Sequence, residues 1–194
     1  MSSVVGFDIG AKTCFVAVAK AGGVETIANE YSQRATPAYV SFGDLQRDLG
    51  TSAQQKVVMN LKSTAWLFKH FVGRPFKDIT VERYQKLIPY EITEVPETGR
   101  VGIKVNHANQ DYVFSIEQCL AMLLGKLKGI ASTGLDNRPV SDCVIAVPYY
   151  LTNAERCAWL EAAEIAGLNP LRLMNETTAV ALQYWGFWDQ INFG

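Results

Sequence analysis

The sequence predicts an α/β fold in which helices pack on one mixed sheet. The first part of the chain carries short apolar strands separated by glycine turns, a pattern typical of an antiparallel meander. The last part alternates strand and helix, which indicates parallel strands. With 194 residues, 48% of them hydrophobic, the chain can fill the core of one large domain or two small ones.

The opening residues predict three strands. Residues 4–9, VVGFDI, form an apolar run that indicates a buried strand, and residues 10–12 form a short turn behind it. Residues 13–19 and 24–27 are further strands, and the Ala-Gly-Gly sequence of residues 21–23 between them is typical of a hairpin. The meander thus carries an aspartate, Asp8, just before its first tight turn.

The middle of the chain mixes short strands with two predicted helices. Helices are expected over 51–59 and 63–71, the second ending at Gly73, and residues 74–89 show no clear pattern. The strands expected here share apolar or alternating composition and cover 39–42, 90–95, 101–105 and 112–114.

The last part predicts a strand-helix-strand-helix unit behind a long amphipathic helix. Ser115 and Gln118 have the spacing of a capping box, as do Thr152 and Glu155, so each pair marks the start of a helix. The second of these helices is expected to end near residue 166. Strands are predicted at 143–147 and 171–174, with a final helix running to about residue 184.

Composition and charge exclude several classes of protein. The net charge of −1 leaves no basic field for nucleic acid or an anionic membrane surface. No apolar run is long enough for a membrane span, and the first residues lack the pattern of a signal peptide. The four cysteines form no C-x-x-C motif, so reduced, buried thiols are expected rather than a zinc site. These features indicate the cytoplasm, with the nucleus left open.

The hexapeptide from Asp8 to Thr13, DIGAKT, is the first candidate site. A strand that ends in aspartate and glycine fixes a carboxylate at the sheet edge and leaves backbone N–H groups free in the loop of Gly10, Ala11 and Lys12. Such amide nests hold phosphate oxygens, and the carboxylate can hold Mg²⁺ through water. On its own this motif is also compatible with an ordinary turn aspartate.

Four other residues could carry chemistry, and each has a simpler alternative. Glu176, in the first turn of the last helix, either interacts with the helix dipole or orients a water in a cleft. Lys69 could serve only solubility or a helix dipole. Pro148 and Arg156, which lie between a strand exit and a helix start, could be a helix-stop proline and a solvated arginine.

Taken together, these segments resemble the 70-kilodalton heat-shock chaperone superfamily. The matching stretches cover most of residues 4–183 and read VVGFDIGAKTCFVAVAKAGGVETIANEYSQRATPAYVSF, LGTSAQQKVVMNLKSTAWLFKHFVGRPF, DCVIAVPYYLTNAERCAWLEAAEIAGL and LRLMNETTAVAL. Residues 27–32, and Thr177 where the main branch has proline, are similar to the large 110-kilodalton branch, whose members work mainly as nucleotide exchange factors and holdases. Ala11 and Lys12 replace two threonines of the main branch, which puts fast hydrolysis in doubt.

The resemblance implies an actin-like, ribonuclease H-like ATPase lobe that binds ATP or ADP with Mg²⁺. Asp8 matches the aspartate on the magnesium side, with the metal held through water, and the segment from Gly10 to Thr13 matches the first phosphate loop. Lys69 matches the lysine that contacts the terminal phosphate and the attacking water, and Glu176 the carboxylate that organises that water. Pro148 and Arg156 match the switch that relays nucleotide state.

The resemblance also implies an incomplete site. Residues 1–184 would form the first lobe of the nucleotide-binding domain and residues 185–194 a divergent tail, so the chain alone is expected to bind ATP poorly and hydrolyse none. The implied partners are a main-branch chaperone and, through domains outside this sequence, unfolded client proteins. Two alternatives remain: a non-catalytic module that binds a partner chaperone, and another actin-fold ATPase such as a sugar kinase, for which no sugar-binding segment is recognisable.

Overall fold

The main sheet of the molecule mixes antiparallel and parallel strands. The computed structural model describes residues 4–20, 23–108 and 110–192, with side chains up to residue 185. The sheet runs in the order β12-β11-β1-β2-β3, and β4 pairs with β2. Its strands are β1 (Val5–Ile9), β2 (Thr13–Lys20), β3 (Gly23–Thr26), β4 (Thr36–Pro37), β11 (Asp142–Val147) and β12 (Asn169–Asn175). The mixed sheet predicted from the sequence is confirmed.

Strand direction in this sheet follows the lengths of the connections. Strands β1, β2 and β3 pair antiparallel through short turns, and residues 21–22 of the predicted hairpin lie outside the described residues. Strand β11 pairs parallel with β1, and β12 pairs parallel with β11. The second crossover is made by α4 (Asn153–Ile165), since parallel neighbours require a long connection.

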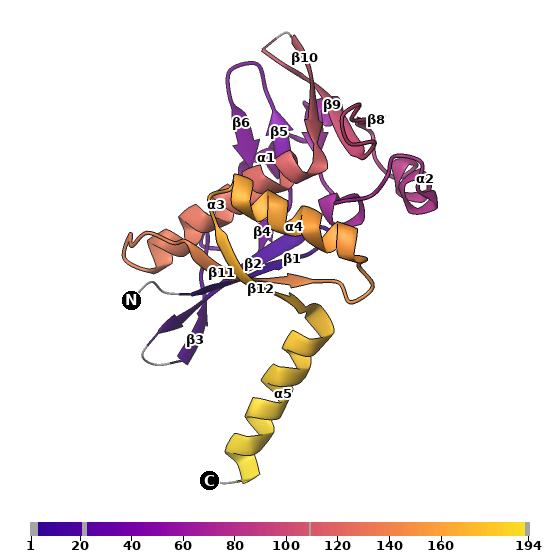
Figure 1. The fold of residues 1–194 in the computed structure, drawn as a ribbon. Helices are drawn as coiled ribbons and strands as arrows, with labels where there is room; N and C mark the ends of the chain where they lie inside the picture. The colour runs from indigo at the N-terminus through magenta and orange to yellow at the C-terminus, as the bar shows by residue number, and fades with distance from the viewer. Residues whose placement is uncertain (1–3, 21–22, 109, 193–194) are drawn as a thin grey trace.

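Two helices bury one face of the sheet. Helices α3 (Ile116–Gly134) and α4 pack against each other and against the sheet, as Figure 1 shows. Alternate residues of β1, such as Phe7 and Ile9, are buried, whereas Asp8 between them is exposed on the opposite face. Both predicted capping boxes are present, which fixes where α3 and α4 begin.

Two small sheets are built from the middle of the chain. One has the order β10-β9-β8 and the other β6-β5-β7. Their strands are β5 (Val40–Phe42), β6 (Arg47–Leu49), β7 (Thr64–Ala65), β8 (Glu91–Glu94), β9 (Val101–His107) and β10 (Gln110–Ser115). The short helices α1 (Thr51–Lys56) and α2 (Ile79–Gln85) lie in the same part of the chain.

The predicted helix over 63–71 is wrong. The segment instead contains two 3₁₀ turns, η1 (Leu61–Ser63) and η2 (Phe68–His70), on either side of β7. Thr64 pairs with β5, and Leu67 has a left-handed φ of 64°, so the chain cannot continue as an α-helix there. Tertiary pairing therefore overrides the local apolar spacing.

Helix α5 (Glu176–Asn192) extends away from the sheet (Figure 1) and runs past the predicted end near residue 184. Its packing involves β12 and β11 near its first turn. Along the rest of its described side chains, Val180, Leu182, Tyr184 and Trp185 are exposed. Within the described part of the chain, no helix is long and apolar enough to cross a membrane.

Candidate functional site

The loop after β1 is held open by close backbone contacts. Gly10 donates its amide N–H to the Thr13 carbonyl oxygen at 2.9 Å, and a Cβ on Gly10 would lie 2.7 Å from that oxygen. Only glycine therefore fits there without a shift of the backbone. The Lys12 carbonyl accepts from the Ala38 amide at 2.8 Å, which anchors the far side of the loop.

The three backbone amides of this loop differ in whether they have a hydrogen-bond partner. The Gly10 amide is used within the loop, whereas no acceptor among the described residues pairs with the amides of Ala11 and Lys12. Two unpaired N–H groups in succession, next to the strand-end carboxylate of Asp8, form the type of nest that binds an anionic oxygen.

Lys69 and Glu176 meet although 107 residues separate them in the sequence. The Lys69 ammonium donates to Glu176 Oε1 as an ion pair, with the Lys69 side chain 14% exposed and the Glu176 side chain 32% exposed. Lys69 lies in the short turn η2, and Glu176 begins α5 directly behind β12. The mostly buried Lys69 ammonium thus lies beside the C-terminal end of β12, the edge strand of the sheet.

Asp8 lies within the electrostatic reach of this pair. Although part of the Asp8 side chain is exposed, the surrounding residues remove some of its hydration; this desolvation and, secondly, the negative charge of Glu176 raise the pKa of Asp8, and Lys69 lowers it. Burial and the Asp8 charge also raise the pKa of the Cys14 thiol to about 12, so Cys14 stays a neutral thiol. The structure therefore joins Lys69 and Glu176 directly, whereas Asp8 interacts with them only through its charge and makes no hydrogen bond or ion pair with either among the described residues.

Arg156 joins this site from the first turn of α4. Its guanidinium donates to Asn175 Oδ1 at 2.8 Å, one residue before Glu176, and to the Leu151 and Tyr149 carbonyls at 3.3 and 3.4 Å. Pro148 begins the turn that carries those carbonyls, and its own carbonyl accepts from the Leu151 amide at 3.5 Å. Arg156 therefore ties the turn after β11 to the end of β12.

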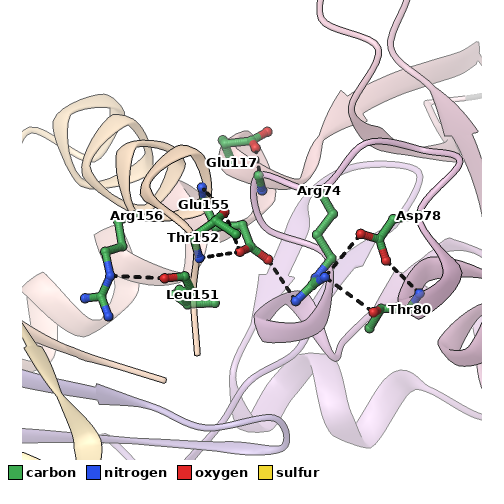
Figure 2. A network of polar contacts seen from close by, with 9 residues as sticks. Arg74, Asp78, Thr80, Glu117, Leu151, Thr152, Glu155 and Arg156 are labelled. Atoms are coloured by element: carbon green, nitrogen blue, oxygen red, sulfur yellow. Dashed lines mark hydrogen bonds and ion pairs between the residues drawn. The ribbon is translucent and has the colours of Figure 1, made fainter. Parts of the chain in front are cut away.

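The sequence reasoning missed a network of partly and fully buried charges around Arg74, five residues after Lys69 (Figure 2). Arg74 lies between Glu155, with Nη2 2.8 Å from Oε1, and Asp78, with Nη1 3.3 Å from Oδ2. Glu155 was identified only as a capping residue, and Arg74 falls in the stretch without a clear pattern. No local signal in the sequence links two charges that lie 81 positions apart.

The donor set suits a magnesium-bound phosphate ester. The carboxylates of Asp8 and Glu176 are oxygen ligands of the kind that Mg²⁺ prefers, and the Lys69 ammonium and the loop amides are phosphate donors. Among the described residues no cluster of three metal-ligating side chains exists, so a metal ion here would keep water and phosphate in its shell. A groove of about 600 Å³ lies elsewhere, beside Phe42 and Asn60.

This mixed sheet, with two helices on one face and its candidate site at the strand ends, belongs to the class of actin-like ATPase lobes. A family model described as "Hsp70 protein" matches residues 4–190, and the chain therefore belongs to the Hsp70 family. The resemblance drawn from the quoted motifs is confirmed, including its assignment to the large 110-kilodalton branch.

Three curated relatives illustrate the match. Human heat shock 70 kDa protein 4 is 53% identical over 182 residues, which cover 94% of this chain and 21% of that protein. The 97 kDa heat shock protein of Strongylocentrotus purpuratus is 49% identical over 94% of this chain and 20% of its own length. Human heat shock 70 kDa protein 4L is 48% identical over 94% of this chain and 22% of its own length. The chain thus spans about a fifth of the length of the curated relatives it matches.

Proposed function

We propose that this chain forms one wall of the Mg²⁺-ATP or Mg²⁺-ADP site of a heat-shock chaperone of the large branch. The observation that carries the proposal is the meeting of Lys69 with Glu176 in the field of Asp8. An ion pair alone would explain why Lys69 meets Glu176, but it leaves unexplained a third charge, Asp8, whose carboxylate repels that of Glu176. A bound cation with its phosphate ligand would compensate for that repulsion, which favours a ligand site beside these residues.

Each group has a separate task in this site. Mg²⁺, when bound, neutralises charge on the phosphate oxygens. Asp8 accepts hydrogen bonds from water on the metal, and the Ala11 and Lys12 amides donate to phosphate oxygens. Lys69 would contact the terminal phosphate, and Glu176 would accept a hydrogen bond from the adjacent water and so fix its orientation. This work is positioning and charge neutralisation, with no covalent bond to the protein.

Weak binding and no hydrolysis are proposed for the 194-residue chain on its own. Its residues approach a nucleotide from one side, and the loop lacks the hydroxyl donors that threonines at positions 11 and 12 would provide. We expect a Kd for Mg-ATP on the order of 1 mM, which corresponds to about −4 kcal/mol.

Calorimetric titration with Mg-ATP tests the proposal. Lys69→Met should weaken binding by about tenfold or more, because a hydrogen bond from a charged group contributes about 1.5–3 kcal/mol. Lys126→Met is the matched control, since Lys126 also forms an ion pair, with Glu30 at 2.6 Å, but from α3. Micromolar binding, or equal affinity in both variants, would contradict the proposal.

A second role, nucleotide exchange on a main-branch chaperone in the cytoplasm, is proposed from the kinship with the large branch. It is favoured by the replacement of both loop threonines by Ala11 and Lys12, because a lobe adapted to slow hydrolysis suits binding rather than turnover. Release of a fluorescent ADP analogue from a main-branch chaperone should accelerate when this chain is added. An unchanged rate of ADP release would argue against the exchange role but would not contradict the proposed nucleotide site.

A further inference from the structure

Two neighbouring residues in the first turn of α4 reach the two chain segments that supply the Lys69–Glu176 pair. Glu155 contacts Arg74, five residues after Lys69, with Nη2 2.8 Å from Oε1. Arg156 contacts Asn175, one residue before Glu176, at 2.8 Å. One turn of one helix therefore touches both segments that must be in register for the ion pair to form.

The segment that carries Lys69 is seated directly on this helix turn. A Cβ on Gly73 would lie 2.7 Å from Glu155 Cα and 2.9 Å from Ala158 Cβ, so the backbone of the segment touches the backbone of α4. The Gly73 amide donates to Glu117 Oε1 of α3 at 3.1 Å. With so close a contact, a shift of α4 must displace the segment as well.

The Arg74–Glu155 pair is buried and costly. The side chains are 16% and 5% exposed, so both charges have lost much of their hydration. Glu155 Oε1 has no partner in hydrogen-bond geometry, so its attraction to Arg74 is Coulombic. The other oxygen, Oε2, accepts from the Thr152 amide at 2.7 Å and hydroxyl at 2.6 Å. Because desolvation can offset the Coulombic attraction of a buried ion pair, its presence is weak evidence for a stabilising role and is compatible with a positional one.

We propose that Arg74 and Glu155 are positioning residues that hold Lys69 in register with Glu176. The proposal rests on the proposed function, in which Lys69 contacts the terminal phosphate. Arg74 also contacts Asp78 at 3.3 Å and Thr80 at 3.4 Å, so the guanidinium is fixed on one side by the start of α2 and on the other by α4. Lys69 acts on the ligand, and the pair acts through Lys69.

Acetylation of Lys69 measures its position without any nucleotide. The full 194-residue chain is treated at pH 8 with a water-soluble N-hydroxysuccinimide acetate, and mass spectrometry gives the rate at Lys69 relative to Lys126. Glu155→Gln removes the charge but keeps the cap of α4, because glutamine also serves in a capping box. We call the Arg74–Glu155 pair the clamp. Loss of the clamp frees the Lys69 amine from Glu176, so the acetylation rate of Lys69 relative to Lys126 should rise about threefold or more. A change of this size is typical of coupling between residues in one network.

Three further variants separate positioning from folding. Arg74→Gln removes the same pair without touching the cap and should reproduce the rise. Arg74→Lys keeps the charge and should restore most of the slow rate. Glu161→Gln, on the same helix, breaks an ion pair with Arg100 of 3.1 Å and should leave Lys69 unchanged.

The outcomes are decisive in both directions. A rise in both Glu155→Gln and Arg74→Gln, absent in Glu161→Gln, supports the clamp. The proposal is overturned if Lys69 in both variants is acetylated at the same rate as in the original sequence. It is also overturned if Glu161→Gln raises the Lys69 acetylation rate as much as they do. Because the assay contains no nucleotide, a failure of the Lys69→Met calorimetry would contradict the proposed function alone.

Discussion

Replacing Gly73 by alanine should destabilise the protein through two separate effects. Gly73 has a φ of +71°, a left-handed conformation that costs an ordinary residue about 1–2 kcal/mol. The new Cβ would also stand 2.7 Å from Glu155 Cα and 2.9 Å from Ala158 Cβ. Overpacking of this kind costs about 1–3 kcal/mol, so the free energy of unfolding should fall by about 2–5 kcal/mol in total.

Urea denaturation followed by circular dichroism measures this loss. For a chain of this size the melting temperature should fall by at least about 4 °C. Gly125→Ala is the matched control, because Gly125 lies inside α3 and a Cβ there meets no atom within 4 Å. That variant should gain about 0.5–1 kcal/mol from helix propensity. A loss below about 0.5 kcal/mol in Gly73→Ala would refute the close contact between the Lys69 segment and α4.

Three further predictions follow from single contacts. Asp8→Asn should raise the free energy of unfolding at pH 7, because burial and Glu176 raise the pKa of Asp8 and its ionised form disfavours folding. The gain should vanish at pH 3, which is below the ordinary aspartate pKa of about 3.9, because Asp8 is then protonated in both the folded and the unfolded chain. Urea titrations that give the same gain at pH 7 and pH 3 would contradict this prediction. Thr152→Ala should cost about 1 kcal/mol through loss of the α4 cap, and an unchanged urea midpoint would argue against the capping box. Iodoacetamide should label Cys157, which is exposed, before the other three cysteines, which are buried, and mass spectrometry showing uniform labelling would contradict their burial.

The parts of the fold that could be predicted from the sequence are those with local signals. Alternating or continuous apolar runs marked β1, β2 and β11, and the capping boxes marked the starts of α3 and α4. The prediction of a helix over 63–71 failed because the conformation of this segment is set by pairing with β5 and by the left-handed Leu67. Neither feature leaves a trace in local composition.

The candidate site divides in the same way. Asp8 and Gly10 could be found from one hexapeptide, since a strand, an aspartate and a tight turn follow each other directly. Lys69 and Glu176 could be identified as site residues only through the family resemblance, because no local sequence pattern indicates that their side chains meet. Arg74 was missed altogether, because its partner Glu155 already had a sufficient local explanation as a helix cap.

The central claim is that Asp8, Lys69 and Glu176 line a site for magnesium-bound nucleotide. The most direct measurement is a ¹H–¹⁵N nuclear magnetic resonance titration of the chain with Mg-ATP. The largest shifts are expected at the Ala11 and Lys12 amides, with smaller shifts around Lys69 and Glu176. In Lys69→Met the same shifts should require about tenfold more Mg-ATP. Shifts gathered instead around the groove beside Phe42, or a silent loop at residues 10–12 with millimolar Mg-ATP, would contradict the claim.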